Sequence, residues 1–337
     1  MPPLFTIGIP TFNRSHFLRR SLAAALAQTQ EGVEVLVCDN ASTDDTEAVT
    51  QAGGAKVRYV RNPSNLGMMG NLVRLVEEAR GEYFSFLQDD DVVHRDWAKK
   101  ALEGFRESKP AVAYLAYLAM SPSVDSWHMP PLYGPSCRMD WMGGSPRVLD
   151  GKLMAPLSLF CAFALPPAMA FHTQTLRATL PLWEKDCDHF IECTPLVATA
   201  KSGTVVVDPW VAAVQQLHPG QYHLTIDGTA DLSRQEQWAQ FARWTAKQME
   251  GWDSGWEKAL GDLLLEMPVE YRIPWLRRME KCDDLPATVI RVRDILRQSI
   301  GNSSDGKPTS KVLSFKDFAR EVTPPFAWRS LQRWRGR

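Results

Sequence analysis

Two hydrophobic periods alternate over the first hundred residues. Short apolar runs predict buried strands, and between them apolar residues recur every three or four positions, as on one face of a helix. Strands are predicted at residues 4–9, 33–38, 56–59 and 83–87. Helices are predicted at residues 14–28 and 68–78, and a further helix is predicted from Ser42 or Thr43 to the vicinity of Gln51. This alternation predicts an α/β fold with a mostly parallel, doubly wound sheet.

The pattern is less regular in the second half. Residues 111–120 and 203–216 predict two more strands, and proline and glycine pairs between residues 130 and 167 indicate long loops. Residues 231–296 are predicted to be helical and are rich in tryptophan. The polar stretch 301–310 is typical of a linker.

A polar cluster follows each of the four predicted strands of the first half. The clusters read PTFNR, DNASTDD, NPSNLG and QDDD in chain order. Ligands of doubly wound sheets bind outside the carboxyl ends of the strands, where such loops lie. We therefore expect the four clusters to converge on one crevice.

The last cluster contains three consecutive carboxylates, Asp89, Asp90 and Asp91. Adjacent negative charges repel one another unless water, a cation or hydrogen-bond donors offset them. Mg²⁺ and Mn²⁺ prefer carboxylate and diphosphate oxygens, so this strand end is a candidate site for a metal-bound nucleotide. A solvated acidic turn, or the cap of a helix that begins near Asp96, explains the same residues.

The other clusters also have two interpretations. Asp39 and Asn40 place a carboxylate beside an amide, which suits the edge of a nucleobase or a ribose hydroxyl. A turn followed by a helix cap accounts for them equally well. Arg14 is a candidate for contact with a phosphate.

Composition limits the possible partners and location. The 337 residues are 45% hydrophobic and 23% charged, and 38 basic against 39 acidic residues give a net charge of -1. No nucleic-acid partner is therefore expected. The six cysteines lack the spacing of a zinc site or a disulfide scaffold, which indicates a cytoplasmic location. Neither a secretory signal nor a transmembrane segment is expected.

Four ordered motifs carry a family resemblance over residues 4–105. IGIPTFNR, VEVLVCDNASTDDT, NPSNLGMMGN and GEYFSFLQDDD together resemble the nucleotide-binding half of family 2 glycosyltransferases. The resemblance implies a GT-A fold, a doubly wound mixed sheet flanked by helices, and a nucleotide-diphospho-sugar donor. The residues it assigns to the donor site are Pro10, Thr11, Asn13, Arg14, Asp39, Asn40, Ser42, Asn65, Gly67, Asn71, Asp89 and Asp90.

The resemblance also implies Mn²⁺ or Mg²⁺ on the donor diphosphate. Gln88 stands where the family often has another Asp, which leaves the register of the triplet open. The alignment assigns Asp91 to the metal, and it assigns Asp89 to the metal or to the ribose. In some GT-A enzymes a histidine after the core sheet completes the site, which makes His218 a candidate. A hydrogen-bonded surface histidine is the alternative for His218 and for His223.

Inverting transfer needs a carboxylate that takes a proton from the acceptor hydroxyl. Residues 184–192 carry four carboxylates before a predicted helix and a turn at Gly203, as the resemblance implies. We expect Asp188 to be the base and Asp186 to be the alternative. The acidic N-terminus of a helix would explain the same residues, and His189 is a candidate for contact with the acceptor.

The final segment, residues 316–337, predicts a basic amphipathic helix. Trp328, Leu331 and Trp334 share one face, and arginines line another. This pattern fits peripheral attachment to the inner face of the cell membrane. Docking on the tryptophan-rich helices or on a second subunit fits it as well.

The predicted organisation is a catalytic domain at 1–225, a helical region at 226–300, and a linker with the basic tail at 301–337. The catalytic domain divides into a nucleotide-binding half, 1–105, and an acceptor-binding half, 106–225. The predicted function is an inverting, metal-dependent glycosyltransferase with a saccharide or lipid-linked saccharide acceptor, in bacterial surface-polysaccharide or glycolipid assembly. A nucleotidyltransferase is less consistent, because PTFNRS lacks the glycines of its phosphate loop. A non-catalytic sugar-nucleotide or glycan-binding module stays an alternative.

Overall fold

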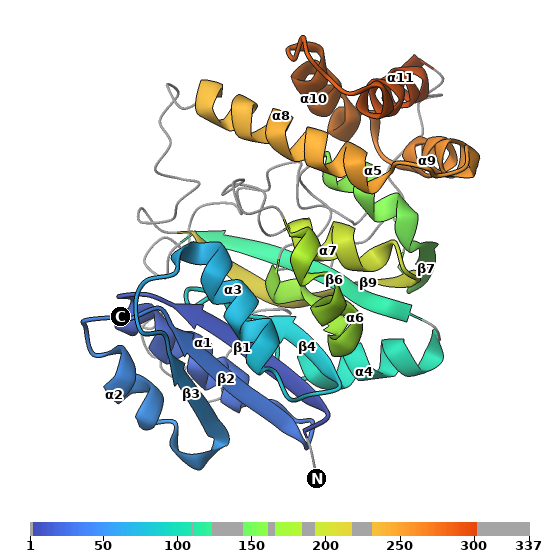
Figure 1. Cartoon of the computed structure of the whole chain (residues 1–337). Helices are drawn as coiled ribbons and strands as arrows, with labels where there is room; N and C mark the ends of the chain where they lie inside the picture. The colour runs from blue at the N-terminus through green and yellow to red at the C-terminus, as the bar shows by residue number, and fades with distance from the viewer. Residues whose placement is uncertain are drawn as a thin grey trace, which may run out of the picture.

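A single mixed sheet organises the protein. The computed structural model describes residues 3–108, 111–122, 144–160, 166–183, 193–217 and 231–301. Helices cover both faces of the sheet, and the helices of the C-terminal region pack beyond one of these faces (Figure 1). The predicted α/β class is therefore confirmed.

The first four strands are parallel and close to their predicted positions. They are β1 (Phe5–Thr11), β2 (Val33–Asp39), β3 (Val57–Arg61) and β4 (Tyr83–Phe86). β1 lies between β2 and β4, and β3 flanks β2. The connecting helices are α1 (Ser15–Leu26), α2 (Thr46–Gln51) and α3 (Gly67–Glu78).

The start of α2 differs from the prediction. Neither Ser42 nor Thr43 caps this helix, which begins at Thr46. Asp44 accepts hydrogen bonds from both the backbone N–H and the hydroxyl of Thr46, at 3.1 and 2.5 Å. Ser42 instead accepts a hydrogen bond from the backbone of Asn13, so the loop between β2 and α2 faces the loop after β1.

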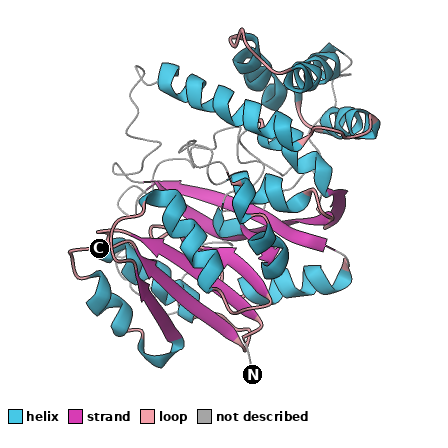
Figure 2. Cartoon of the chain, in the orientation of Figure 1, coloured by secondary structure: helices cyan, strands magenta, loops and turns pink. Residues whose placement is uncertain are grey.

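The second half extends the sheet and makes it mixed. It contributes β5 (Val92–Val93), β6 (Ala111–Pro122), β7 (Arg147–Asp150), β8 (Met169–His172) and β9 (Thr204–Leu217). The strand order is β3-β2-β1-β4-β8-β6-β9-β5, with β7 also paired to β9. The β8 strand is antiparallel to β4 and β6, whereas β6 and β9 are parallel to each other. Figure 2 shows the strands of the sheet with helices on both sides.

Two hydrophobic layers enclose the sheet. On one face, α1 packs against β1 and β2, and α4 (Trp97–Glu107) packs against β6 and β9. On the other face, α3 packs against β1 and β2, α6 (Thr173–Ala178) against β8, and α7 (Cys193–Ala200) against β6. The sheet is thus fixed from both sides, with its strand ends left to the connecting loops.

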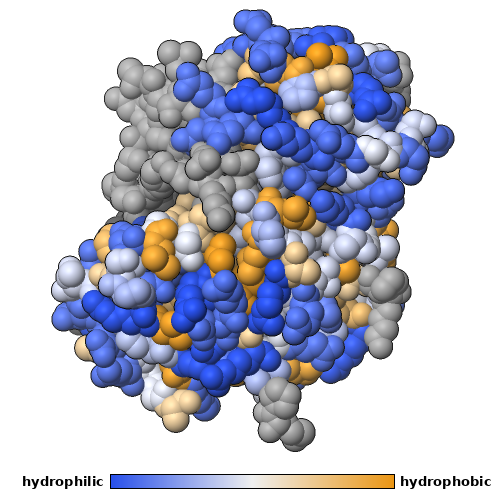
Figure 3. Space-filling model, in the orientation of Figure 1, coloured by the Kyte–Doolittle hydropathy of each residue, from blue (hydrophilic) through white to orange (hydrophobic). Residues whose placement is uncertain are grey.

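The C-terminal helices share the second of these layers. They are α8 (Asp231–Gln248), α9 (Gly255–Glu266), α10 (Val269–Glu280) and α11 (Ala287–Gly301), as the predicted helical region requires. Trp238 of α8 is fully buried, and its indole N–H donates to the carbonyl of Leu159, just after α5 (Met154–Ser158), at 3.0 Å. In Figure 3 the outer surface of this region is largely hydrophilic, as expected if its apolar side chains face inward.

Within the described ranges, no helix is both long and apolar enough to cross a membrane. The predicted tail at 316–337 lies outside those ranges. The boundaries predicted at residues 225 and 300 stay predictions.

Candidate active site

The loops after β1 and β4 meet at the carboxyl edge of the sheet. Arg14 Nη1 lies 2.9 Å from Asp89 Oδ1, and Arg14 Nη2 lies 2.9 Å from Asp90 Oδ2. The Thr11 hydroxyl donates to the second oxygen of Asp89 at 2.8 Å. One guanidinium therefore bridges two neighbouring carboxylates, and both oxygens of Asp89 accept hydrogen bonds from the first loop.

Asp89, Asp90 and Asp91, hereafter the acidic triplet, are 4%, 8% and 1% exposed. Two other elements hold this triplet in place. The Ser21 hydroxyl of α1 donates to the Asp89 carbonyl at 2.5 Å. The backbone N–H of Gln216, near the end of β9, donates to Asp91 Oδ1 at 3.2 Å.

Charge within the triplet depends on Arg14. Burial raises the pKa of Asp89 to about 7, the charge of Arg14 opposes that shift, and the charge of Asp90 adds to it. Burial lowers the pKa of the Arg14 guanidinium, but the two carboxylates raise it by more, so the net shift is upward. The arginine therefore supports the ionised form of a carboxylate that is removed from water.

Asp39, at the end of β2, is completely buried and accepts three hydrogen bonds. The Tyr59 hydroxyl and Arg61 Nη1 donate to Asp39 Oδ2 at 2.5 and 2.9 Å, and the backbone N–H of Ser42 donates to Oδ1 at 2.9 Å. Burial and the bond to Asp39 raise the pKa of Tyr59 to about 12. Asp39 thus joins the end of β3 to the loop that follows β2.

The first two loops are locked together in an unusual backbone conformation. The backbone N–H of Asn13 donates to the Ser42 hydroxyl at 2.8 Å, and the Asn13 side chain accepts from the backbone of Thr43 at 2.7 Å. Asn13 and Ala41 have φ angles of 53° and 67°, in the left-handed region that non-glycine residues rarely adopt. Such strain persists only where surrounding contacts fix it, and it is common at functional sites.

The third loop binds the second through asparagines. Asn40 donates to the Asn65 side chain at 2.7 Å and accepts from the backbone N–H of Leu66 at 2.8 Å. Asn62 donates to both Asn40 and Asn71, at 3.0 and 2.9 Å. These amides connect the start of α3 to the end of β2.

Gly67 and Asn71 complete this connection. The Gly67 carbonyl accepts from Asn40 at 3.1 Å, and Gly67 has a φ of +74°. Asn71 donates to the carbonyl of Cys38 at 3.0 Å. Gly67 therefore adopts a left-handed conformation that suits glycine.

The network contains nearly every motif residue that the resemblance implies. The exceptions are Pro10, which pairs with Cys38 inside the sheet, and Gly67, which takes part through its backbone carbonyl. Sequence reasoning missed five members of the network, namely Ser21, Tyr59, Arg61, Asn62 and Gln216. Arg61 directly precedes the third motif and Asn62 is its first residue, which was the available signal. Asp186, Asp188, His189, His218 and His223 lie outside the described residues.

Apolar side chains flank this polar network. Phe12, Leu66 and Met68 are 39%, 46% and 46% exposed. They follow β1 and β3, beside Thr11, Asn13 and Gly67 of the motifs. The polar strand ends therefore have exposed hydrophobic neighbours, as a site for a partly apolar ligand requires.

The described carboxylates only partly fit the metal site expected from the sequence. In the described ranges, no group of three or more His, Cys, Asp or Glu side chains is arranged to hold a metal ion. Asp89 fits poorly, because the positive charge of Arg14 lies beside it and opposes a cation there. Asp91 is a buried oxygen donor that the backbone N–H of Gln216 holds in place.

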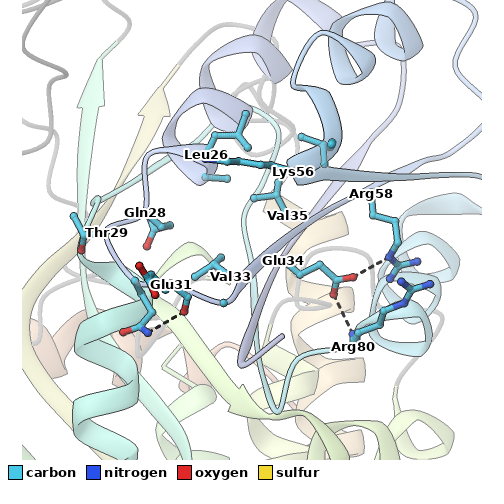
Figure 4. A pocket seen from close by; sticks show the side chains of 15 residues that line it. Leu26, Gln28, Thr29, Glu31, Val33, Glu34, Val35, Lys56, Arg58 and Arg80 are labelled. Atoms are coloured by element: carbon cyan, nitrogen blue, oxygen red, sulfur yellow. Dashed lines mark hydrogen bonds and ion pairs between the residues drawn. The ribbon is translucent and has the colours of Figure 1, made fainter. Parts of the chain in front are cut away.

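A separate cavity of about 690 Å³ opens at the opposite edge of the sheet (Figure 4). It lies at the amino ends of β2 and β3. Glu34 accepts from Arg58 at 2.8 Å and from the backbone of Arg80 at 3.1 Å, so these groups offset one another. This cavity does not adjoin the network of strand-end loops.

Comparison with solved structures supports the fold. The chain is similar to S. aureus TarS 1–349 in complex with UDP-GlcNAc, at a TM-score of 0.56 and 14% identity, over 90% of this chain and 93% of that one. It is also similar to the mannosyltransferase PcManGT from Pyrobaculum calidifontis in complex with GDP-Man and Mn²⁺. That match has a TM-score of 0.51 and 16% identity, over 89% of this chain and 86% of the other. The fold is thus of the GT-A type, with C-terminal helices added.

Sequence comparisons match the first half of the chain to glycosyltransferases. An uncharacterized glycosyltransferase, RP339, from Rickettsia prowazekii is 30% identical over 117 residues, 34% of this chain and 36% of that protein. A chondroitin synthase from Escherichia coli is 35% identical over 108 residues, 31% of this chain and 16% of that enzyme. The chain thus matches about a third or less of these relatives' own length. Residues 6–165, just under half of the chain, match the model of glycosyl transferase family 2.

Proposed function

We propose that this protein is an inverting, metal-dependent glycosyltransferase. It moves a sugar from a nucleotide-diphosphate donor to a saccharide hydroxyl. The observation that carries the proposal is the network at the carboxyl edge of the sheet, where hydrogen bonds join the loops after four strands in a series that ends at the buried acidic triplet. A sheet edge of this kind is the usual ligand site of a doubly wound fold.

The motif residues are proposed to hold the donor, some directly and some by fixing loops. Asp39 belongs to the second group, because its three hydrogen bonds go to protein groups. Phe12 and Arg61 are the more accessible groups nearby, since the Phe12 residue is 39% exposed and the Arg61 side chain 42% exposed. An aromatic ring and a guanidinium suit the face and the edge of a nucleobase. TarS and PcManGT, which share the fold, were crystallised with nucleotide sugars.

A divalent cation, Mn²⁺ or Mg²⁺, is proposed at Asp91. Bound there, it would supply positive charge to the diphosphate leaving group. PcManGT was crystallised with Mn²⁺, which is consistent with this assignment. His218 remains a candidate second ligand.

The base is proposed to be Asp188, with Asp186 as the alternative. The helix that follows these residues is present as α7, and the turn at 201–203 leads into β9. A carboxylate before this helix would have to face the acceptor hydroxyl to accept its proton. Exchange of each Asp for Asn distinguishes the two candidates.

The acceptor is proposed to be a saccharide or a lipid-linked saccharide of bacterial surface-polysaccharide or glycolipid assembly. The family relationship to a chondroitin synthase supports a polysaccharide context. Attachment of residues 316–337 to a membrane surface would suit a lipid-linked acceptor, and it is proposed on the amphipathic pattern alone.

Thermal shift measurements with UDP, GDP, dTDP and CMP, each with and without Mn²⁺, test the proposed donor site. We expect one nucleoside diphosphate to raise Tm, and Mn²⁺ to increase that shift, because a ligand that binds only the folded state stabilises it. No response to any nucleotide would contradict the donor site. A response without release of nucleoside diphosphate from any sugar donor would identify a binding module instead.

A further inference from the structure

Arg14 stands between the acidic triplet and any cation that approaches it. Its two terminal nitrogens each lie 2.9 Å from a different carboxylate, one on Asp89 and one on Asp90. Its guanidinium also lies 5.1 Å from the centre of the Phe17 ring. This planar fork matches two carboxylates at once, which a point charge such as lysine cannot do.

The guanidinium and a divalent cation would need the same oxygens. Asp89 already uses one oxygen for Thr11 and the other for Arg14, and Asp90 uses Oδ2 for Arg14. Mg²⁺ and Mn²⁺ bind carboxylate oxygens directly at short range, so a cation on these oxygens would lie beside the guanidinium. Two positive groups would also repel each other within the triplet.

The surroundings let Arg14 move while the carboxylates stay in place. The Arg14 side chain is 31% exposed, whereas those of Asp89 and Asp90 are 5% and 9% exposed. Ser21 holds the backbone of Asp89, and the backbone of β9 holds Asp91, independently of Arg14. Loss of the guanidinium therefore leaves an oriented set of oxygens.

We propose that Arg14 is an internal counter-ion that competes with a divalent cation for Asp89 and Asp90. A cation enters the acidic triplet fully only when the guanidinium leaves at least one of these two carboxylates. The biological role of this competition rests on the proposed metal-dependent function. The competition itself concerns cation binding and does not require turnover. It departs from a simple preformed metal site, in which Arg14 would have no effect on metal affinity or would improve it.

The test compares Mn²⁺ affinity of wild type and Arg14→Met by isothermal titration calorimetry at pH 8, with no nucleotide present. Methionine keeps an apolar stem beside Phe17 and removes the competing charge. We expect Arg14→Met to bind Mn²⁺ about tenfold or more tightly than wild type. Mn²⁺ should also raise the Tm of this variant more than that of wild type.

Arg74→Met is the matched control. Arg74 lies on α3, where its half-exposed side chain pairs with Glu78 at 2.7 Å. Its loss removes one positive charge from the surface but none from the triplet, so the Mn²⁺ affinity should equal that of wild type. An equal gain in Arg74→Met would show a net-charge effect and would overturn the proposal.

The proposal is also overturned if folded Arg14→Met binds Mn²⁺ no more tightly than wild type, or if neither protein binds it. Should Arg14→Met not fold without metal, Arg14→Lys replaces it, because lysine keeps a charge but faces one carboxylate at a time. Arg14→Lys is then expected to bind Mn²⁺ more tightly than wild type, and no gain overturns the proposal. Tighter Mn²⁺ binding without any donor turnover would remove the proposed function and leave this inference standing.

Discussion

Asp39 and Asp89 are two buried strand-end carboxylates that are held by different groups. Asp39 is bound by the end of β3 and by its own loop, through Tyr59, Arg61 and the backbone of Ser42. Asp89 is bound by the loop after β1. Loss of one buried carboxylate should therefore disturb one loop contact and leave the other.

Asp39→Asn is expected to lower the free energy of unfolding by about 1–3 kcal/mol, the usual cost of losing hydrogen bonds to a buried charged group. The new side-chain amide would point its NH₂ group either at the backbone N–H of Ser42 or at Arg61. Either arrangement is unfavourable, because it places two hydrogen-bond donors against each other. Urea unfolding measures the change. Asp45→Asn, an exposed Asp in the same loop, is the control and should leave stability unchanged. Equal stability of the two variants would show that the Asp39 contacts do not hold the loop.

At this scale the sequence predicted the motif residues but not all of their partners. Asp39 and Arg61 are paired across β2 and β3 by the register of two parallel strands. Register depends on how the strands align in space, and the apolar pattern of two short strands does not specify it. Tyr59 and Arg61 were missed for that reason, and Ser21 was missed because its partner Asp89 is distant in sequence. Thr11 and Asp89 stood out by their motifs.

The loops that join the elements have a left-handed backbone at Asn13, Ala41 and Gly67, which is strained at the two residues that are not glycine. Ala41 and Asn13 have positive φ without being glycine, and Gly67 has a φ of +74°. Asn tolerates this conformation better than Ala, because its short polar side chain makes local hydrogen bonds. These loops also bind one another, so their strain is part of how the site is fixed.

Exchanges at Ala41 and Gly67 should have opposite effects. Ala41→Gly removes a left-handed alanine and is expected to raise the free energy of unfolding by up to about 1 kcal/mol, after the entropy that glycine adds to the unfolded chain. Gly67→Ala is expected to lower it by about 1 kcal/mol through backbone strain alone, because a Cβ there meets nothing within 4 Å. Thermal unfolding of both variants measures the difference, and changes of the same sign would contradict this reading of the loops.

Element prediction succeeded where periodicity was long enough to read. The strands and helices of residues 4–87 match their predicted positions within a few residues, apart from the later start of α2. β5, β7 and β8 were not predicted, because two to four residues are too few to show a period and their pairing partners are distant in sequence. β5 and β7 both pair with β9, and β8 pairs with β4 and β6, so tertiary contacts define these strands.

Across the whole molecule, the sheet and the C-terminal helices share one hydrophobic cluster. That cluster includes Leu157, Leu196, Trp238 and Leu264, from four different helices, together with Phe86 of β4. A continuous core of this kind usually unfolds as a unit. The C-terminal helices should therefore support the region that carries the strand-end site.

Trp238→Ala tests this coupling. Removal of a fully buried indole is expected to cost about 3–5 kcal/mol and to lower the unfolding midpoint of the sheet as well as of the helices. Trp252→Ala, at a partly buried ring outside the centre of the core, is the control with a smaller effect. Hydrogen exchange of β1 and α8 amides reports on the two regions separately. Loss of protection in α8 alone would show that the regions unfold independently.

The central claim is that the converging strand ends form the site of a nucleotide-sugar donor and its metal. The most direct test measures Mn²⁺-dependent release of nucleoside diphosphate from UDP-GlcNAc, UDP-glucose and GDP-mannose, with saccharide acceptors, for wild type and Asp91→Ala. The account predicts turnover of at least one donor by wild type. It also predicts a loss of about a hundredfold or more in folded Asp91→Ala, with no change in the surface control Asp262→Asn. Turnover by Asp91→Ala at the wild-type rate and with the same Mn²⁺ dependence would contradict it.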